Sequence, residues 1–259
     1  MRKHACAAFS LVELLISISV ISILMCLIMP AVGRARSTAR SIQCLGNLRQ
    51  LIAGWDFYAE DFRDYCMPQV WFQHNPPLYW WGTNGTPSDY TVGFLYPYLA
   101  MGAGRDNVFD CPEQPWGSYI PQGMAQAPTT TYGYNGMYLC PPASGWSWGS
   151  TSRRWLTLGV IQSPSQVFVL ADTLADFGWS ALPRNNCLLD GPQYPFGSWP
   201  RNPWPSHAFR HRGRSCIAFA DGHVGAAHPS EITSASYPIG YVGDDAAPHY
   251  VPDWRSHAP

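Results

Sequence analysis

The sequence predicts an α+β protein in which a long N-terminal helix packs on a head of antiparallel β-sheet with long loops. Residues 9–29 form one apolar run whose only charged residue is Glu13. Apolar residues then recur at spacings of three and four up to Phe62, as on one face of an amphipathic helix. Near the C-terminus, two apolar segments flank Asp221-Gly222, a pair typical of a hairpin turn.

The apolar run is long enough to cross a membrane. About 20 apolar residues span a bilayer as a helix, and the basic residues Arg2 and Lys3 ahead of the run suit a cytoplasmic start. We expect a helix over residues 9–63, of which about 9–31 span the membrane. The remainder is expected to bury one face formed by Leu45, Leu48, Ile52, Trp55, Ala59 and Phe62.

Glu13 distinguishes this segment from an ordinary anchor. A carboxylate in the hydrocarbon region costs roughly 2.5 to 3.5 kcal/mol on insertion scales, so we expect it to have a partner. Residues 1–8 form a short basic segment that ends in small residues, as in a leader that is removed before Phe9. Removal would leave an ammonium group on Phe9, one helical turn before Glu13. The alternative is a plain signal anchor in which Glu13 lies near the membrane surface.

The stretch from Ala8 to Leu15 resembles the processing site of type IV prepilins and of type II secretion pseudopilins. In that family a prepilin peptidase cuts before an aromatic residue and methylates the new amine, which implies processing here between Ala8 and Phe9. The resemblance implies a type IV pilin-like fold and assembly roles for Phe9, Glu13 and the helix-bending Pro30. The family usually has Gly where this chain has Ala8.

Three further stretches resemble a pilin-like group from planctomycete-type bacteria. Residues 41–68 contain a Cys-x-x-Asn-Leu and a Tyr-Ala-x-Asp pattern, and residues 131–136 are also similar to that group. Nine residues separate His211 from Asp221-Gly222, which matches the His-x9-Asp-Gly signature of the same group. The resemblance therefore extends from the leader to the C-terminal part of the chain.

The C-terminal signature contains a predicted hairpin. Residues 215–220 and 223–227 are expected to be its strands, with a two-residue turn in which both central residues have positive φ. Alternation along the first strand places Ile217 and Phe219 on one face of the sheet. The opposite face is then formed by Cys216, Ala218 and Ala220.

The spacing of the signature predicts an architectural role. Ten residues of extended strand cover about 33 Å, so we expect His211 and Asp221 to lie far apart and not to form a catalytic or metal-binding pair. His211 would then fix the start of the strand, and Asp221 with Gly222 its turn. A buried strand is also predicted over residues 167–171, with Asp172 at its end. Aspartates at strand ends can be catalytic or bind a metal, but more often they close a turn, and we expect this role for Asp172.

The sequence predicts no cofactor, no metal and no catalytic residue. It lacks a Cys-x-x-Cys pair, a Gly-x-Ser-x-Gly elbow, a phosphate loop and a His-Glu-x-x-His motif. Of the eight cysteines, six lie beyond the leader and the membrane segment, where disulfides are possible with the pairing open. A four-histidine zinc site is an alternative that proline-rich flanks disfavour; its members are His207, His211, His223 and His228.

The bulk composition narrows the function. The net charge is −1, only 13% of the residues are charged and no lysine follows Lys3, which argues against a nucleic-acid partner. We expect a structural subunit of a type IV pilus or type II secretion filament, and not an enzyme. Its expected partners are prepilin peptidase and other pilin or pseudopilin subunits. It would lie in the inner membrane, with residues 64–259 as a head in the periplasm or outside the cell.

The main alternative belongs to a different class of protein. Aromatic residues alternate with Gly, Pro, Asn and Ser in the loops around Trp80 and Trp146. Such rings could stack on sugars, or they could cover a head that has little regular structure. The alternative is therefore a membrane-tethered carbohydrate-binding module, although no polar residue set accompanies the rings and we favour the covering role. A third alternative is a substrate-tethered hydrolase.

Overall fold

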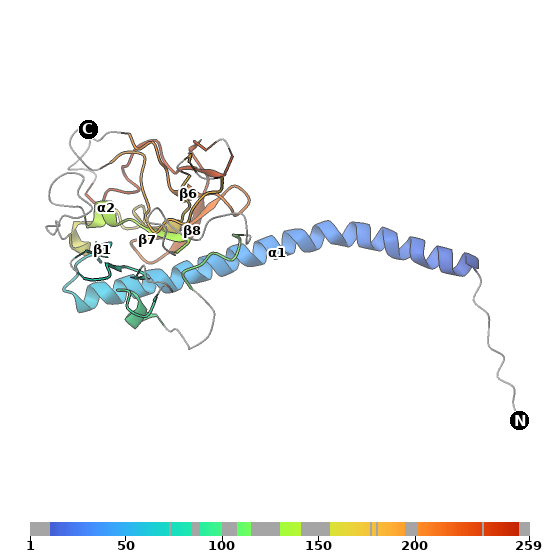
Figure 1. Cartoon of the computed structure of the whole chain (residues 1–259), viewed down its shortest axis with the longest axis horizontal. Helices are drawn as coiled ribbons and strands as arrows, with labels where there is room; N and C mark the ends of the chain where they lie inside the picture. Colours follow the sequence, from blue (N-terminus) through green and yellow to red (C-terminus); the bar gives the residue numbers. More distant parts are fainter. Residues whose placement is uncertain are drawn as a thin grey trace, which may run out of the picture. The chain divides into compact units, whose positions relative to one another are not determined.

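The computed structural model describes residues 11–72, 74–83, 89–99, 108–114, 130–140, 156–176, 178–179, 181–194, 201–234 and 236–253. The chain divides between Ala39 and Arg40 into two compact units. The long helix α1 (Leu11–Asp61) contributes to both, so its two parts are described separately (Figure 1). The predicted α+β class is confirmed, because α1 is followed by antiparallel sheets.

The first part of α1 is an exposed apolar helix that runs through Pro30 without interruption. The hydroxyl groups of Ser17, Ser19 and Ser22 each donate a hydrogen bond of 2.7 Å to the backbone carbonyl four residues earlier. These bonds satisfy the hydroxyl groups without water. Among the described helices, α1 is the one long and apolar enough to cross a membrane, with a mean hydropathy of 2.7 in its most apolar window.

The second part of α1 buries one face in the head. The buried residues are Cys44, Leu48, Leu51, Ile52, Gly54, Trp55, Tyr58 and Ala59. Their spacings of three and four confirm the predicted amphipathic pattern. Phe62 does not follow it, because α1 ends at Asp61 and the Phe62 side chain, 49% exposed, stacks on Tyr58 beyond the helix end.

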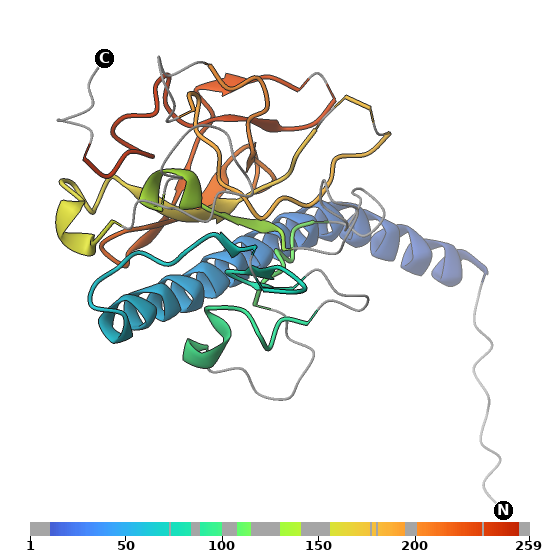
Figure 2. The same ribbon diagram turned by 60° about the vertical axis from the view of Figure 1, so that its left-hand side comes forward.

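The head contains a four-stranded antiparallel sheet in the order β4-β5-β7-β8. Its strands are β4 (Tyr132–Tyr134), β5 (Phe168–Asp172), β7 (Ser215–Phe219) and β8 (Val224–Ala227). β5 lies in the middle and pairs with β4 on one side and with β7 on the other. Figures 1 and 2 both show the second part of α1 beside the strands of the head, within the same compact unit.

The two faces of this sheet belong to different hydrophobic clusters. Cys216 and Ala218 belong to the larger cluster, together with the buried face of α1. Ile217 belongs to a second cluster, and Phe219 packs against that cluster. The predicted alternation along β7 is therefore confirmed, and it explains how the strand covers two cores at once.

The other elements of the head are short. Three of them form a sheet in the order β1 (Val70–Trp71), β2 (Leu78–Tyr79) and β3 (Gly82–Thr83). A second such sheet has the order β6 (His207–Ala208), β10 (Ile239–Tyr241) and β9 (Glu231–Ile232). The helical turns are α2 (Gly136–Leu139), η1 (Tyr96–Tyr98) and η2 (Leu158–Val160). Loops and turns form much of the remainder, as the 23 Gly and 24 Pro residues predict.

The hairpin between β7 and β8 has a longer turn than the sequence predicts. The backbone N–H of Gly222 donates to the carbonyl of Phe219 at 3.0 Å, and the N–H of Phe219 donates to the carbonyl of His223 at 2.9 Å. Gly222 has a φ of 84°, whereas Asp221 does not have positive φ. The connection is therefore a three-residue loop that ends on a left-handed glycine, and the predicted two-residue turn is wrong.

Gly133 of β4 is expected to tolerate no side chain. A Cβ atom there would lie 2.4 Å from the carbonyl oxygen of Leu188, which is backbone and does not yield easily. We expect Gly133→Ala to lower the free energy of unfolding of the head by about 1–3 kcal/mol. The measurement is denaturant unfolding of the full chain in detergent micelles, followed by tryptophan fluorescence.

Gly225→Ala on β8 is the matched control. A Cβ atom at Gly225 would meet the Phe219 ring at 3.5 Å, an ordinary contact. Because Gly loses more backbone freedom on folding than Ala, this change should leave the stability unchanged or raise it by up to about 1 kcal/mol. Equal losses at the two positions would contradict the close approach at Gly133.

Candidate functional site

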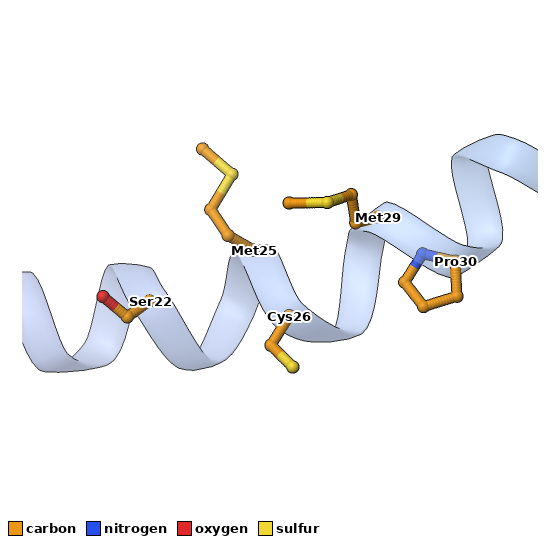
Figure 3. A pocket seen from close by; sticks show the side chains of 5 residues that line it. All are labelled: Ser22, Met25, Cys26, Met29 and Pro30. Carbon is orange, nitrogen blue, oxygen red and sulfur yellow. The ribbon is translucent and has the colours of Figure 1, made fainter.

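The residues predicted to act in processing and assembly lie at the N-terminal end of the chain. Ala8 and Phe9 fall outside the described residues, so a contact between the Phe9 amine and Glu13 stays a prediction. Glu13 lies in the first turn of α1, where the helix dipole favours a negative charge. A hollow on the apolar segment is lined by Ser22, Met25, Cys26, Met29 and Pro30 (Figure 3).

The two ends of the C-terminal signature have different surroundings. His211 is buried before β7, and its Nδ1 atom lies 3.1 Å from Oγ of Ser41 on α1. Asp221 is exposed on the hairpin turn and accepts a hydrogen bond from the backbone N–H of His223 at 3.2 Å. That the signature serves the architecture stays a prediction, and these separate contacts are in keeping with it.

The hairpin turn also approaches α1. A Cβ atom at Gly222 would lie 3.5 Å from Oδ2 of Asp56, so the turn packs against this helix side chain. Burial, with smaller contributions from the negative charges of Glu60 and Asp221, raises the pKa of Asp56 to about 6. The negative charges of Glu60 and Asp221 therefore act on Asp56 where the turn contacts the helix.

A buried polar cluster surrounds Asp172, which ends β5 and is fully buried. The backbone N–H of Cys216 donates to Asp172 Oδ2 at 2.9 Å, and His211 Nε2 lies 3.0 Å from the same oxygen. Arg210 Nε lies 3.7 Å from Oδ1, and the Cys44 thiol lies 3.4 and 3.5 Å from the two oxygens. The expected turn-closing role of Asp172 is wrong, because its carboxylate points between α1 and β7.

The charges of this cluster support one another. Burial alone would raise the pKa of Asp172, but the Arg210 guanidinium and the hydrogen bond from His211 outweigh it and lower that pKa. Burial likewise opposes the charged form of His211, yet its contacts with Asp172 and Cys111 raise its pKa to about 10. The pKa of the Cys44 thiol is raised by burial, so the group is neutral. At neutral pH the cluster thus holds an imidazolium, a guanidinium and a carboxylate.

Ser41, His211 and Asp172 form a chain of contacts similar to a hydrolase triad. In such triads the carboxylate contacts Nδ1 of the imidazole and the serine contacts Nε2, whereas here the two are exchanged. Ser41 also lies inside α1, where backbone N–H groups bond to carbonyls four residues earlier and cannot form an oxyanion hole. His211 is 4% exposed and Asp172 0%, so the arrangement does not support hydrolysis.

Two more side chains complete the cluster. The Cys111 thiol lies 3.2 Å from His211 Nε2, and the Tyr132 hydroxyl donates to the Cys44 sulfur at 3.3 Å. In the part of the chain that the structure describes, no disulfide joins any of the six cysteines for which the sequence leaves disulfides possible. They are Cys44, Cys66, Cys111, Cys140, Cys187 and Cys216.

The four histidines of the alternative zinc site lie in different places. His207 is buried, its Nδ1 lies 3.1 Å from Ser215 Oγ, and burial lowers its pKa to about 3. His223 and His228 are exposed on and after the hairpin. Among the described residues, the group whose ligand atoms all lie within 4.8 Å of one another is formed by Cys44, Asp172, His211 and Cys216.

The sequence alone does not predict this group, because its members come from distant segments with no short metal-binding motif between them. Two signals pointed toward it. The Cys-x-x-Asn-Leu pattern marks Cys44, and alternation along β7 placed Cys216 on the face opposite Ile217. Neither signal could show that both sulfur atoms lie beside Asp172.

The tryptophans suspected of sugar binding are in part core residues. Trp80 is fully buried, and its indole N–H donates to the carbonyl of Cys187 at 2.9 Å. Its ring packs at 5.9 Å between centroids against Phe109. Trp81 is also fully buried, whereas Trp146 lies outside the described residues. Trp80 therefore has no face available for a sugar ring.

Residues 3–28 match the family model of the prokaryotic N-terminal methylation motif. This match supports a prepilin-type, pilin-like protein, and it covers the predicted processing site and Glu13. No curated protein and no solved structure matches the chain.

Asp172 is expected to be the charge on which the head depends most. Asp172→Asn would leave Arg210 and His211 without their buried anion, and breaking a buried pair in this way typically costs about 3–5 kcal/mol. The denaturant midpoint of the full chain in micelles measures the loss. Asp221→Asn on the exposed turn is the control and should change the stability by less than about 1 kcal/mol. A larger loss at Asp221 would show that the turn carries the stability instead.

Asp56→Asn is expected to stabilise the head at about pH 7.5 and to change little at about pH 4. Because folding raises the pKa of Asp56, the contribution of this group to stability is fully present below its unfolded-state pKa of about 3.9. That contribution is lost as the pH rises through the folded-state pKa of about 6. Because Asp56 is only half-buried, we expect about 1 kcal/mol or less. Thermal melts at the two pH values measure this, with Asp64→Asn, exposed in the turn that follows α1, as the control. A pH-independent effect would refute the assignment.

Proposed function

We propose that this chain is a pilin-like or pseudopilin-like structural subunit, made as a precursor with residues 1–8 as its leader. Prepilin peptidase would cut between Ala8 and Phe9 and methylate the new amine. The observation that carries the proposal is the match of residues 3–28 to the N-terminal methylation motif. The exposed apolar surface of α1 up to Pro30 supports it, because such a surface needs a membrane or neighbouring helices.

Glu13 would act as the charge that sets the register of assembly. Glu13 lies in the first turn of α1, four residues after Phe9, on which cleavage would create an ammonium group. A carboxylate and an ammonium in an apolar environment attract each other more strongly than in water. A neighbouring subunit that supplied the ammonium would fix the axial position of the two helices.

The apolar segment of α1 is suited to helix packing. Figure 3 shows Met25 and Met29 directed to one side of the helix around the hollow that Ser22 and Pro30 also line. Methionine side chains adapt to irregular surfaces, and small or hydroxyl-bearing residues allow close approach of a second helix. The hydroxyl groups of the serines are already bonded to their own helix, so packing would not leave them unsatisfied.

The subunit would sit in the inner membrane with residues 64–259 as a head in the periplasm or outside the cell. The filament could be a type IV pilus or a type II secretion-type pseudopilus. The signature residues His211, Asp221 and Gly222 would serve the architecture of the head. A carbohydrate-binding role is not favoured, because Trp80 and Trp81 are core residues.

Mass spectrometry of the N-terminus tests the class of protein. The chain is extracted from membranes of a cell that contains prepilin peptidase, and its terminal peptide is sequenced. We expect a mature chain that begins with methylated Phe9. An intact Met1 would leave only a signal anchor and would reject the proposal.

Glu13→Ala is expected to reduce incorporation into filaments without blocking cleavage. Loss of about 1.4 kcal/mol or more of charge attraction between subunits corresponds to a tenfold or greater loss of incorporation against co-expressed wild type. The ratio of the two chains in sheared filaments, measured by mass spectrometry, gives the effect. Glu60→Ala, exposed on the second part of α1, is the control. Incorporation of Glu13→Ala at the wild-type level would contradict the assigned role.

A further inference from the structure

We propose that Cys44, Asp172, His211 and Cys216 bind one zinc ion inside the head. Their ligand atoms all lie within 4.8 Å of one another, and all four residues are buried. Thiolate and imidazole ligands favour zinc-class ions over calcium and magnesium, which prefer oxygen. The proposal is independent of the assembly function, because it concerns residues within Arg40–Pro259 alone.

The distances suit a tetrahedral ion. Zinc lies about 2.3 Å from sulfur and about 2.0–2.1 Å from nitrogen or oxygen, so its ligand atoms are about 3.3–3.8 Å apart. His211 Nε2 lies 3.0 Å from Asp172 Oδ2, and the Cys44 sulfur lies 3.4 Å from Asp172 Oδ1. The widest separations in the group need to close by only about 1 Å.

The orientation of His211 is that of a metal ligand. Its Nε2 lies 3.0 Å from the Asp172 carboxylate and 3.2 Å from the Cys111 sulfur, while its Nδ1 lies 3.1 Å from the hydroxyl of Ser41. A ligating imidazole commonly donates its other N–H to such an outer partner, which fixes the ring and its tautomer. Ser41 is therefore a positioning residue for His211. A catalytic Cys-His pair would have the thiol at one ring nitrogen of the histidine and the orienting carboxylate at the other. In this structure the Cys111 thiol and the Asp172 carboxylate both lie beside Nε2 of His211.

The charges balance when the ion is bound. Zinc binds cysteine as thiolate, histidine as neutral imidazole and aspartate as carboxylate, so binding releases the proton of each thiol. Two thiolates, one carboxylate and Zn²⁺ carry a net charge of −1. Arg210, whose Nε lies 3.7 Å from Asp172 Oδ1, supplies the compensating positive charge. Within the described residues, its Nε and Nη1 are buried without a hydrogen-bond partner.

The site would be structural. Its ligands come from four places in the head: Cys44 from α1, Asp172 from the C-terminal end of β5, His211 from the segment before β7, and Cys216 from β7 itself. An ion bound to all four would crosslink the helix to the sheet. Four protein ligands fill a tetrahedral site, whereas a catalytic zinc site keeps one position open. Cys111 lies beside His211 as a thiol outside the proposed set.

Elemental analysis tests the proposal. The untagged full-length protein is purified in detergent with a reducing agent and without chelator, and zinc is measured per chain. We expect about one zinc ion per chain in the wild type and loss of it in Cys44→Ala and Cys216→Ala. Cys66→Ala and Cys187→Ala, which remove cysteines outside the set, should retain the ion.

A second variant separates loss of metal from loss of fold. Ser41→Ala leaves all four ligands in place, and removal of an outer partner typically lowers metal affinity about 10- to 100-fold. Competition of the metal-free protein for Zn²⁺ against a chromophoric chelator measures this affinity. Thr38→Ala, whose hydroxyl bonds to its own helix at Arg34, is the control and should leave it unchanged.

Three results would overturn the proposal. The first is wild-type protein with free thiols and well below one transition-metal ion per chain, together with no binding of added Zn²⁺. The second is unchanged zinc content in the Cys44→Ala/Cys216→Ala double variant. The third is a disulfide that joins Cys44 to Cys216 or to Cys111 in the protein isolated under alkylating conditions.

Discussion

A buried carboxylate, Asp172, joins the parts of the head that are far apart in the sequence. Placing a carboxylate in a core costs several kcal/mol unless charges and hydrogen bonds replace the lost water. Here the backbone N–H of Cys216 donates a hydrogen bond to the carboxylate, and His211 and Arg210 supply the neighbouring positive charges. The Cys44 thiol of α1 contacts the same carboxylate. The position of β5, β7 and the second part of α1 relative to one another is thereby set within one compact unit.

The same helix meets two different physical requirements along its length. Up to about Pro30 its apolar side chains are exposed all round, so the hydrophobic effect is satisfied only by a membrane or by other helices. From Cys44 onward it buries one face against the sheet, and the head supplies its own apolar partner. A subunit that assembles through its N-terminal segment needs this division, because the head can then stay folded whatever surrounds the first part of α1.

Local patterns predicted the local features of the fold well. Spacing identified the buried face of α1, and alternation identified the two faces of β7 through Ile217 and Cys216. The turn at Asp221 was predicted with the wrong length, because Asp-Gly suits both a two-residue turn and a loop that ends on a left-handed glycine. The cluster at Asp172 could not be predicted, because its partners are brought together by strand order and helix packing, which no short pattern encodes.

The spacing of His211 and Asp221 acquires a physical meaning from the helix beside them. His211 contacts Ser41 of α1, and the turn at Gly222 packs against Asp56 of the same helix. Fifteen residues of α-helix rise about 22 Å, and the five residues of β7 together with their flanks cover a similar length. The strand between the two ends of the signature is thus matched to the stretch of α1 that it accompanies. The architectural role predicted for the signature would follow from these two contacts, because one residue more or less would move the turn or the imidazole away from its helix partner.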